Sequence, residues 1–211
     1  MTKKRVLIAN RGEIALRIIR SVKELDMEAI AVYSDVDADS LHVKRADEAY
    51  YLGGSLPSES YRNMKKLMKA VADTNADMVH PGYGFLAENA DFAKAVQKKD
   101  VIWIGPNPET IKSMGDKIES RKLISKAGLN PVPGQLKPSR TKREATKDAT
   151  EFGYPVALKA AHGGGGKGLR IVHNEKELLD NFEIVKRESE AYFGSSQIYV
   201  EKFIKPARHV E

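Results

Sequence analysis

The chain has 211 residues, 41% hydrophobic and 30% charged, a composition typical of a soluble globular protein with one large or two small domains. It contains no apolar run of about 18 residues, so we expect no membrane-spanning helix, and the absence of cysteine excludes disulfides, thiolate metal sites and cysteine nucleophiles. The net charge of +6 comes from 35 basic residues spread among 29 acidic ones, without the aromatic and basic stripe of single-strand binders, so we expect no nucleic-acid surface. The first apolar stretch is interrupted at Asn10, which is atypical of a signal peptide, and a cytoplasmic location is the default expectation.

The first part of the chain alternates short apolar runs with amphipathic segments. The predicted strands cover 6–9, 29–33, 78–79 and 101–104, and the predicted helices cover 13–25, 61–72 and 89–98. Ser60 is the predicted N-cap of the second helix. Strands separated by helices predict a parallel sheet with helices on both faces. The turn at Asn10–Glu13 has one glycine where a dinucleotide site has three, so we expect no NAD-type cofactor there.

The second part begins after a stretch rich in glycine and proline, Gly128–Gly134, which is a candidate domain boundary. Beyond it, the predicted helices cover 141–152 and 175–190, and the predicted strands cover 155–161, 169–172 and 197–201.

The most informative segment is the run Gly163-Gly164-Gly165-Gly166-Lys167-Gly168. Consecutive glycines lose much backbone entropy on folding, so a requirement for bare backbone must compensate for it. The usual requirement is the close approach of amide groups to phosphate oxygens. Lys167 lies within the run and Lys159 on the predicted strand before it, and both cations suit a polyphosphate.

Three kinds of phosphate-binding loop compete for this run. A Walker A loop needs Ser or Thr after Gly-Lys and a glycine five residues earlier, but Gly168 and Ala161 stand there. A dinucleotide loop opens a helix, whereas Leu169–Val172 reads as a strand. A hairpin folded over nucleotide phosphates fits best, and a glycine-rich surface turn is the alternative.

Several segments match a known family in order and spacing. They are Ala9-Asn10-Arg11-Gly12-Glu13-Ile14-Ala15, His80-Pro81-Gly82-Tyr83-Gly84-Phe85-Leu86-Ala87-Glu88-Asn89, Ile104-Gly105-Pro106, Met114-Gly115-Asp116-Lys117 and the glycine run. The chain resembles biotin carboxylases, the ATP-grasp subunits or domains of acetyl-CoA, propionyl-CoA and pyruvate carboxylases. The resemblance covers essentially the whole chain, as about the first half of such a protein.

The resemblance implies an α/β fold. It implies a parallel-sheet, Rossmann-like pre-ATP-grasp domain over 1–116, then an incomplete ATP-grasp domain over 117–211 with a small lid at about 133–203. The implied ATP-binding residues are Lys117, Lys159, Gly163, Gly164, Gly165, Gly166, Lys167, Gly168, Glu201, Lys202, Phe203, Ile204 and His209. Tyr83 and Gly84 would lie near the biotin or bicarbonate site.

The family reaction, as the resemblance implies it, is ATP-dependent carboxylation of carrier-bound biotin by bicarbonate through carboxyphosphate. It implies ATP, magnesium or manganese, and biotin on a carrier protein or domain. The implied partners are that carrier, a carboxyltransferase subunit and a second copy bound through the N-terminal region. The metal carboxylates, the bicarbonate-binding arginine and the general base belong to family segments beyond Glu211. We therefore expect no catalytic or metal-binding residue in this chain, which alone would be inactive and bind ATP weakly or not at all.

Each assignment has a structural alternative. Lys117 could be a solvated lysine, His80 a turn residue, Glu88 with Asn89 a helix cap, and Glu13 a partner of the helix dipole. Another ATP-grasp ligase resembling carbamoyl-phosphate synthetase, or a non-catalytic assembly module, would be the alternative function.

Overall fold

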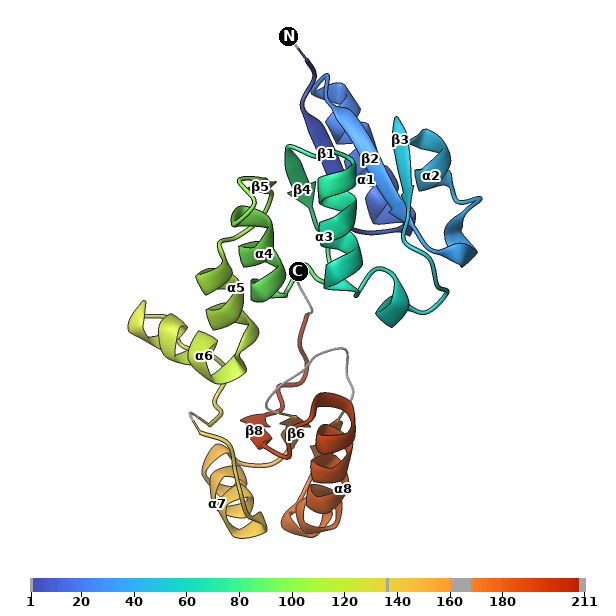
Figure 1. Cartoon of the computed structure of the whole chain (residues 1–211). Coiled ribbons are helices and arrows are strands. Elements are labelled where there is room, and N and C mark those ends of the chain that lie inside the picture. The colour runs from blue at the N-terminus through green and yellow to red at the C-terminus, as the bar shows by residue number, and fades with distance from the viewer. Residues whose placement is uncertain (1, 136, 161–167, 209–211) are drawn as a thin grey trace. The chain divides into compact units, whose positions relative to one another are not determined.

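The computed structural model describes residues 2–135, 137–160 and 168–208, with the backbone alone at 117, 118, 192 and 193 (Figure 1). The chain divides into two compact units, Met1–Lys112 and Ser113–Glu211. Within the described ranges, no helix is both long and apolar enough to cross a membrane.

The first unit is built on a five-stranded parallel sheet in the order β3-β2-β1-β4-β5. Its strands are β1 (Arg5–Ile8), β2 (Glu28–Tyr33), β3 (Glu48–Tyr51), β4 (Met78–His80) and β5 (Ile102–Trp103). Leu7 in the central strand lies opposite Ile30 on one side and Val79 on the other. From β1 the chain continues to β2 on one side of the sheet, and from β4 it continues to β5 on the other side. The strand order therefore reverses between the neighbours β1 and β4, and ligands of open α/β sheets bind at such a point.

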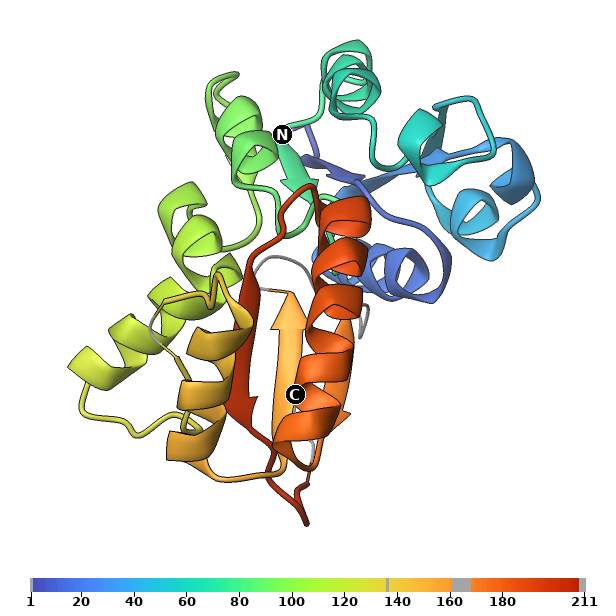
Figure 2. The same ribbon diagram turned by 90° about the horizontal axis from the view of Figure 1, so that it is seen from below.

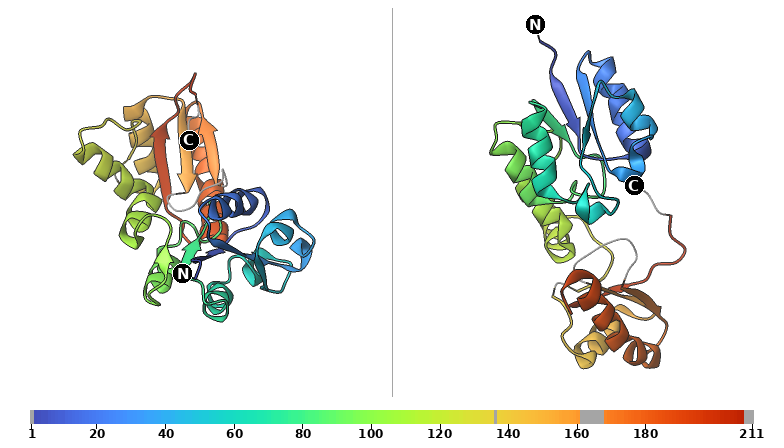
Figure 3. Two further views of the ribbon diagram at one scale, coloured as in Figure 1. Left: turned by 90° about the horizontal axis from the view of Figure 1, so that it is seen from above. Right: turned by 45° about the vertical axis from the view of Figure 1, so that its right-hand side comes forward.

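Helices cover both faces of this sheet (Figure 3, right). They are α1 (Gly12–Glu24), α2 (Leu41–Arg45), α3 (Met64–Asp73), α4 (Ala90–Gln97) and α5 (Pro108–Gly115), with short 3-10 turns at Asp35–Asp37 and Pro57–Glu59. The first unit has a hydrophobic core on each face of the sheet, and alternate residues of β1 belong to different cores. Val6 packs in the cluster with Ile18 of α1, whereas Leu7 packs in the cluster with Phe92 of α4. The predicted α/β class is confirmed.

One predicted helix start was wrong, and two helices and one strand were missed. The helix predicted to start at Tyr61 begins at Met64, and its cap is Asn63, whose side chain accepts from the Lys66 amide at 3.1 Å. Ser60 instead donates to the Leu56 carbonyl at 2.8 Å within the preceding turn. Helices α2 and α5 and strand β3 were not predicted, because all three are short and the residues of β3 are exposed or half-buried.

The second unit is built on an antiparallel sheet in the order β7-β6-β8. Its elements are α6 (Lys117–Lys126), α7 (Lys142–Phe152), β6 (Val156–Ala160), β7 (Leu169–Val172), α8 (Glu175–Phe193) and β8 (Ile198–Lys202). Helices α7 and α8 lie across one face of the sheet (Figure 2), where Leu158 and Val200 pack with Phe182. Because side chains alternate along a strand, Lys159, Tyr199 and Glu201 belong to the opposite face.

A short segment before α7 runs beside β8. The Lys202 amide donates to the Pro133 carbonyl at 2.7 Å, and the Gln135 amide donates to the Val200 carbonyl at 3.1 Å. Gly134 forms an antiparallel bridge with Glu201. The turn-rich stretch 128–134 therefore connects α6 to this sheet inside the second unit.

His42 on α2 is a buried titratable group, 1% exposed. Its Nε2 lies 3.3 Å from the Val32 carbonyl, and its Nδ1 has no partner among the described residues. Burial lowers the pKa of His42; the Val32 hydrogen bond and Asp37 raise it, and Arg11 lowers it. Burial also lowers the pKa of His80.

We expect the free energy of unfolding to fall as the pH drops below about 6.5, the pKa of histidine in an unfolded chain. Below that pH the histidines bind protons in the unfolded chain but stay neutral in the folded chain, because their pKa values are lowered there. The free energy of unfolding is therefore highest above that pH, and it falls below it by at most about 1.4 kcal/mol per pH unit for each histidine. Urea unfolding across this range, with His42→Leu for comparison, measures the effect. An equally steep pH dependence in the variant would contradict a role for His42.

Candidate nucleotide-binding face

Strands β6 and β7 form the hairpin on which the candidate site depends. They pair antiparallel, with Lys159 opposite Leu169, and the Ala160 amide donates to the Gly168 carbonyl at 3.1 Å. The segment between Ala160 and Gly168 therefore joins two neighbouring antiparallel strands. The predicted strand after the glycine run is confirmed, and a loop that opens a helix is excluded.

The glycine run itself falls mostly outside the described residues. Gly163, Gly164, Gly165, Gly166 and Lys167 lie there, and so does His209. Gly168 is described: it is buried and has a φ of +64°, a left-handed conformation that favours glycine. Lys117 begins α6, and its backbone alone is described.

Lys159 and Glu201 form an ion pair on the face of the sheet that α7 and α8 leave uncovered. Their side chains are 32% and 19% exposed, so the pair is accessible to a ligand but partly shielded from water. The ammonium is the group that would bind phosphate oxygens, and the carboxylate at present neutralises it. A polyanion that binds here must compete with Glu201 for the ammonium.

The three residues after Glu201 make different contacts. The Lys202 ammonium donates to the Gly153 carbonyl at 2.8 Å and to the Tyr154 carbonyl at 3.0 Å, beyond the end of α7. The Phe203 amide donates to the Pro155 carbonyl at 3.0 Å, and the Ile204 side chain is exposed. The Lys202 side chain is therefore engaged within the second unit.

The turn after β4 carries Tyr83 and Gly84. The Asn10 carboxamide donates to the Pro81 carbonyl at 2.7 Å and to the Tyr83 carbonyl at 2.8 Å, which fixes this turn against the end of β1. Gly82 has a φ of +64°, and a Cβ there would lie 2.8 Å from Asn10 Nδ2, so the turn requires glycine. The Tyr83 ring is exposed, and its hydroxyl donates to Glu13.

Three of the structural alternatives describe positions or contacts that the structure contains. The Gly82 amide donates to His80 Nδ1 at 3.0 Å, so His80 supports the turn. Asn89 caps α4 by accepting from the Phe92 amide at 2.8 Å. Glu13 lies in the first turn of α1 and also accepts from Tyr83.

Sequence reasoning missed a buried carboxylate near the ends of β1 and β2. Asp37 is 2% exposed and accepts from Arg11 Nε and the Tyr61 hydroxyl, both at 2.6 Å. It also accepts from Ser34 and Ser40, each at 3.2 Å. The Arg11 hydrogen bond holds the pKa of Asp37 well below its usual range. The alternation of acidic residues in Asp35-Val36-Asp37 was the available signal, but only packing shows which carboxylate is buried.

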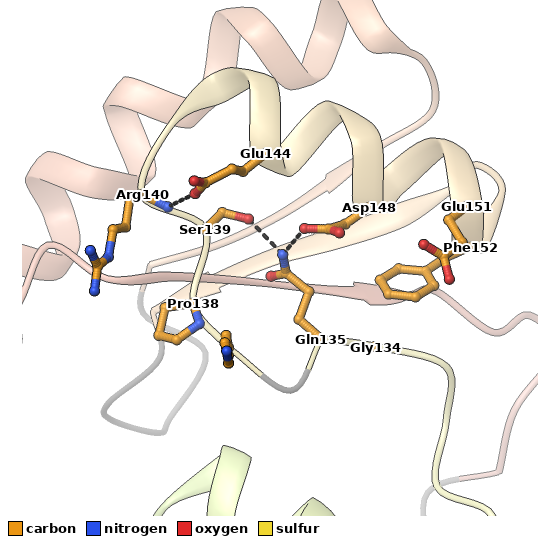
Figure 4. Close-up of a pocket in the computed structure, with 10 residues that line it drawn as sticks. Gly134, Gln135, Pro138, Ser139, Arg140, Glu144, Asp148, Glu151 and Phe152 are labelled. Atoms are coloured by element: carbon orange, nitrogen blue, oxygen red, sulfur yellow. Dashed lines mark hydrogen bonds between the residues drawn. The ribbon is translucent and has the colours of Figure 1, made fainter.

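A pocket lies beside the segment that pairs with β8 (Figure 4). Gln135 donates to Ser139 at 2.7 Å and to Asp148, and it accepts from the Val200 amide at 2.8 Å. The Arg140 amide donates to Glu144 at 2.7 Å. These polar groups bind one another, and the network anchors Gly134 and its neighbours beside β8. Among the described residues, no group of three or more His, Asp or Glu side chains could hold a metal ion.

Comparison with known proteins places both halves of the chain. The family described as "Biotin carboxylase, N-terminal domain" matches residues 2–111, and the one described as "Carbamoyl-phosphate synthase L chain, ATP binding domain" matches residues 116–211. Biotin carboxylase 1 of Bacillus subtilis is 46% identical over 208 residues, which are 99% of this chain and 46% of that protein. The mitochondrial propionyl-CoA carboxylase alpha chain of Homo sapiens is 47% identical over 207 residues, 98% of this chain and 28% of that protein.

Solved structures agree. The biotin carboxylase domain dimer of Hydrogenobacter thermophilus 2-oxoglutarate carboxylase, crystallised with MgADP, ADP and bicarbonate, superposes with a TM-score of 0.91 at 43% identity. The match covers 97% of this chain and 45% of that one. The chain thus spans less than half the length of each of these three proteins.

Proposed function

The chain belongs to the biotin carboxylase family, and from that premise we propose that it forms the ATP-binding part of an enzyme that carboxylates carrier-bound biotin with bicarbonate. The observation that carries the proposal is the Lys159–Glu201 pair, on the sheet face that α7 and α8 do not cover, beside a hairpin whose connection is a glycine run. A ligase resembling carbamoyl-phosphate synthetase is not favoured, because the first half of the chain matches the biotin carboxylase N-terminal domain.

The proposed domains and their roles follow the two family matches. We propose a biotin carboxylase N-terminal domain over 1–116 and the beginning of the ATP-grasp domain over 117–211, with the lid at about 133–203. Lys159, Lys117 and the run 163–168 would hold the phosphates of ATP. Glu201, Phe203, Ile204 and the main chain of Lys202 would contact the adenine, and His209 the ribose or phosphates. Tyr83 and Gly84 would line the biotin or bicarbonate site.

The described residues fit a nucleoside triphosphate. Lys159 offers an ammonium that is partly exposed, on a strand that leads directly into the glycine run. Backbone amides and an ammonium stabilise charge on a transferring phosphoryl group, which is the dominant contribution in such chemistry. Magnesium would enter with the nucleotide and neutralise its phosphates. Its protein carboxylates are proposed in family segments that follow position 211.

In the reaction proposed, a bicarbonate oxygen attacks the γ-phosphorus of ATP, and the bond from that phosphorus to ADP breaks. The carboxyphosphate formed releases carbon dioxide and phosphate, and the ureido nitrogen of biotin loses a proton and gains the carboxyl group. Lys159 would release Glu201 and bind the phosphates throughout. Such a chain would work with a biotin carrier, a carboxyltransferase and a second copy of itself. The acceptor would be an acyl-CoA such as acetyl- or propionyl-CoA, or pyruvate.

A chimera tests the proposal. Replacing the matched segment of Bacillus subtilis biotin carboxylase 1 with this chain supplies the segments that the match does not cover. We expect the chimera to hydrolyse ATP only when biotin and bicarbonate are both present. The unmodified Bacillus protein is the matched control. A folded chimera that hydrolyses ATP without regard to biotin, or not at all, would contradict the proposed function.

A further inference from the structure

Tyr199 lies on the nucleotide-facing side of the sheet, yet it is fully buried. It is the direct cross-strand partner of Lys159, and it precedes Glu201 by two residues, so all three side chains share one face. Its exposed fraction is 0%. A tyrosine in this position is not part of the core under α7 and α8, and something other than that core must explain it.

Two elements cover Tyr199. The Arg121 guanidinium carbon of α6 lies 5.7 Å from the centre of the ring, a cation–π contact. Gly134 lies over the hydroxyl, because a Cβ on Gly134 would fall 2.5 Å from Tyr199 Oη and 2.9 Å from Glu201 Cβ. Because Gly134 has no side chain, the Tyr199 hydroxyl and the Glu201 Cβ can both lie against its backbone.

The Tyr199 hydroxyl makes no hydrogen bond to any described residue. A buried hydroxyl without a partner destabilises a fold by about 1–3 kcal/mol, so its retention needs a reason. Burial raises the pKa of Tyr199 well above the usual range. Arg121 opposes this effect, whereas Glu201 adds to it through its charge and as a nearby hydrogen-bond acceptor, although the present geometry falls short of a hydrogen bond. The hydroxyl is thus a proton donor at neutral pH that lies within electrostatic reach of the Glu201 carboxylate.

We propose that Tyr199 is a positioning residue whose hydroxyl binds the Glu201 carboxylate when Lys159 leaves it for the phosphates of a bound nucleotide. The inference rests on the proposed function, since it needs a polyanion that draws Lys159 away. A carboxylate that is 19% exposed cannot rely on water alone once its ammonium partner moves. With Tyr199 as second donor, Glu201 keeps its place while Lys159 changes partners.

A double-mutant cycle tests this without any nucleotide. Tyr199→Phe removes the hydroxyl and keeps the ring, and Lys159→Met removes the ammonium in advance. We expect Tyr199→Phe to lower the unfolding equilibrium constant at least about fivefold in the wild-type chain, because it removes a buried hydroxyl that has no partner there. In the Lys159→Met chain, where the hydroxyl is bonded, the same change should raise that constant about tenfold. Equal effects in both backgrounds would show a packing role only and overturn the inference.

A spectroscopic measurement covers the case in which the double variant does not fold. In the chain labelled with 13C at the tyrosine ring carbon that bears the hydroxyl, Lys159→Met alone should shift the Tyr199 resonance, because the hydroxyl then donates to Glu201. Lys147→Met, which removes an exposed charge from α7, is the matched control and should leave it in place. An unmoved Tyr199 resonance in Lys159→Met would overturn the inference.

The chimera separates this inference from the function on which it rests. There, Tyr199→Phe should raise the KM for ATP about threefold to tenfold while kcat stays nearly constant. Coupling in the cycle together with an inactive chimera would refute the nucleotide site. Tyr199 could then still bind Glu201, but no bound nucleotide would draw Lys159 away from it. An active chimera together with an additive cycle would refute the role of Tyr199 alone.

Discussion

Replacing Asp37 with alanine should destabilise the first unit by about 2–4 kcal/mol, a large part of the 5–15 kcal/mol that holds a typical domain together. The carboxylate is buried and accepts hydrogen bonds from Arg11, Tyr61, Ser34 and Ser40. Alanine leaves the Tyr61 hydroxyl and the inner side of the Arg11 guanidinium without their acceptor. Because the Arg11 side chain is 44% exposed, water compensates for part of that loss. Urea unfolding at neutral pH measures the effect.

Asp39 provides the matched control for that variant. It lies two residues away, carries the same charge, and its side chain is fully exposed with one ion pair to Lys44. Asp39→Ala should therefore leave the urea midpoint almost unchanged. If the two variants unfold at the same midpoint, the buried network does not hold the ends of β1 and β2 together.

Replacing Lys159 with methionine should lower kcat/KM for ATP in the chimera about tenfold to a hundredfold, because a hydrogen bond to a charged group contributes about 1.5–3 kcal/mol. The affinity for ATP should fall more than the affinity for adenosine, since the ammonium is proposed to bind phosphates. Steady-state hydrolysis and equilibrium titration with both ligands provide the measurements.

The control for Lys159 must remove a positive charge without touching the proposed site. Lys147→Met does so from the exposed side of α7, the helix that covers the opposite face of the sheet. It should leave hydrolysis unchanged. Equal losses in both variants would mean that the general positive charge of the chain attracts the nucleotide, and Lys159 would then have no specific role.

Hydrophobic patterning was sufficient for most of the elements. The apolar runs that became β1 and β2 are buried on both faces, so their sequence is nearly continuous and easily recognised. The strand after the glycine run was identified in the same way, and it decided between a hairpin and a helix-opening loop. Strand β3 is short and exposed or half-buried, so it gave no such signal, and the true cap Asn63 was overlooked because Ser60 has the same local chemistry.

The sequence by itself determined the α/β class, the strand–glycine run–strand order and the family, because these depend on local periodicity and on motifs whose spacing is read along the chain. Only the tertiary structure decided which charges meet. The pairing of β6 with β8 brings Lys159 to Glu201 across 42 positions. The packing of the first unit brings Arg11 to Asp37, and the bridge from Gly134 covers Tyr199. Contacts between residues distant in sequence depend on strand register and on burial, and neither is encoded in any single segment.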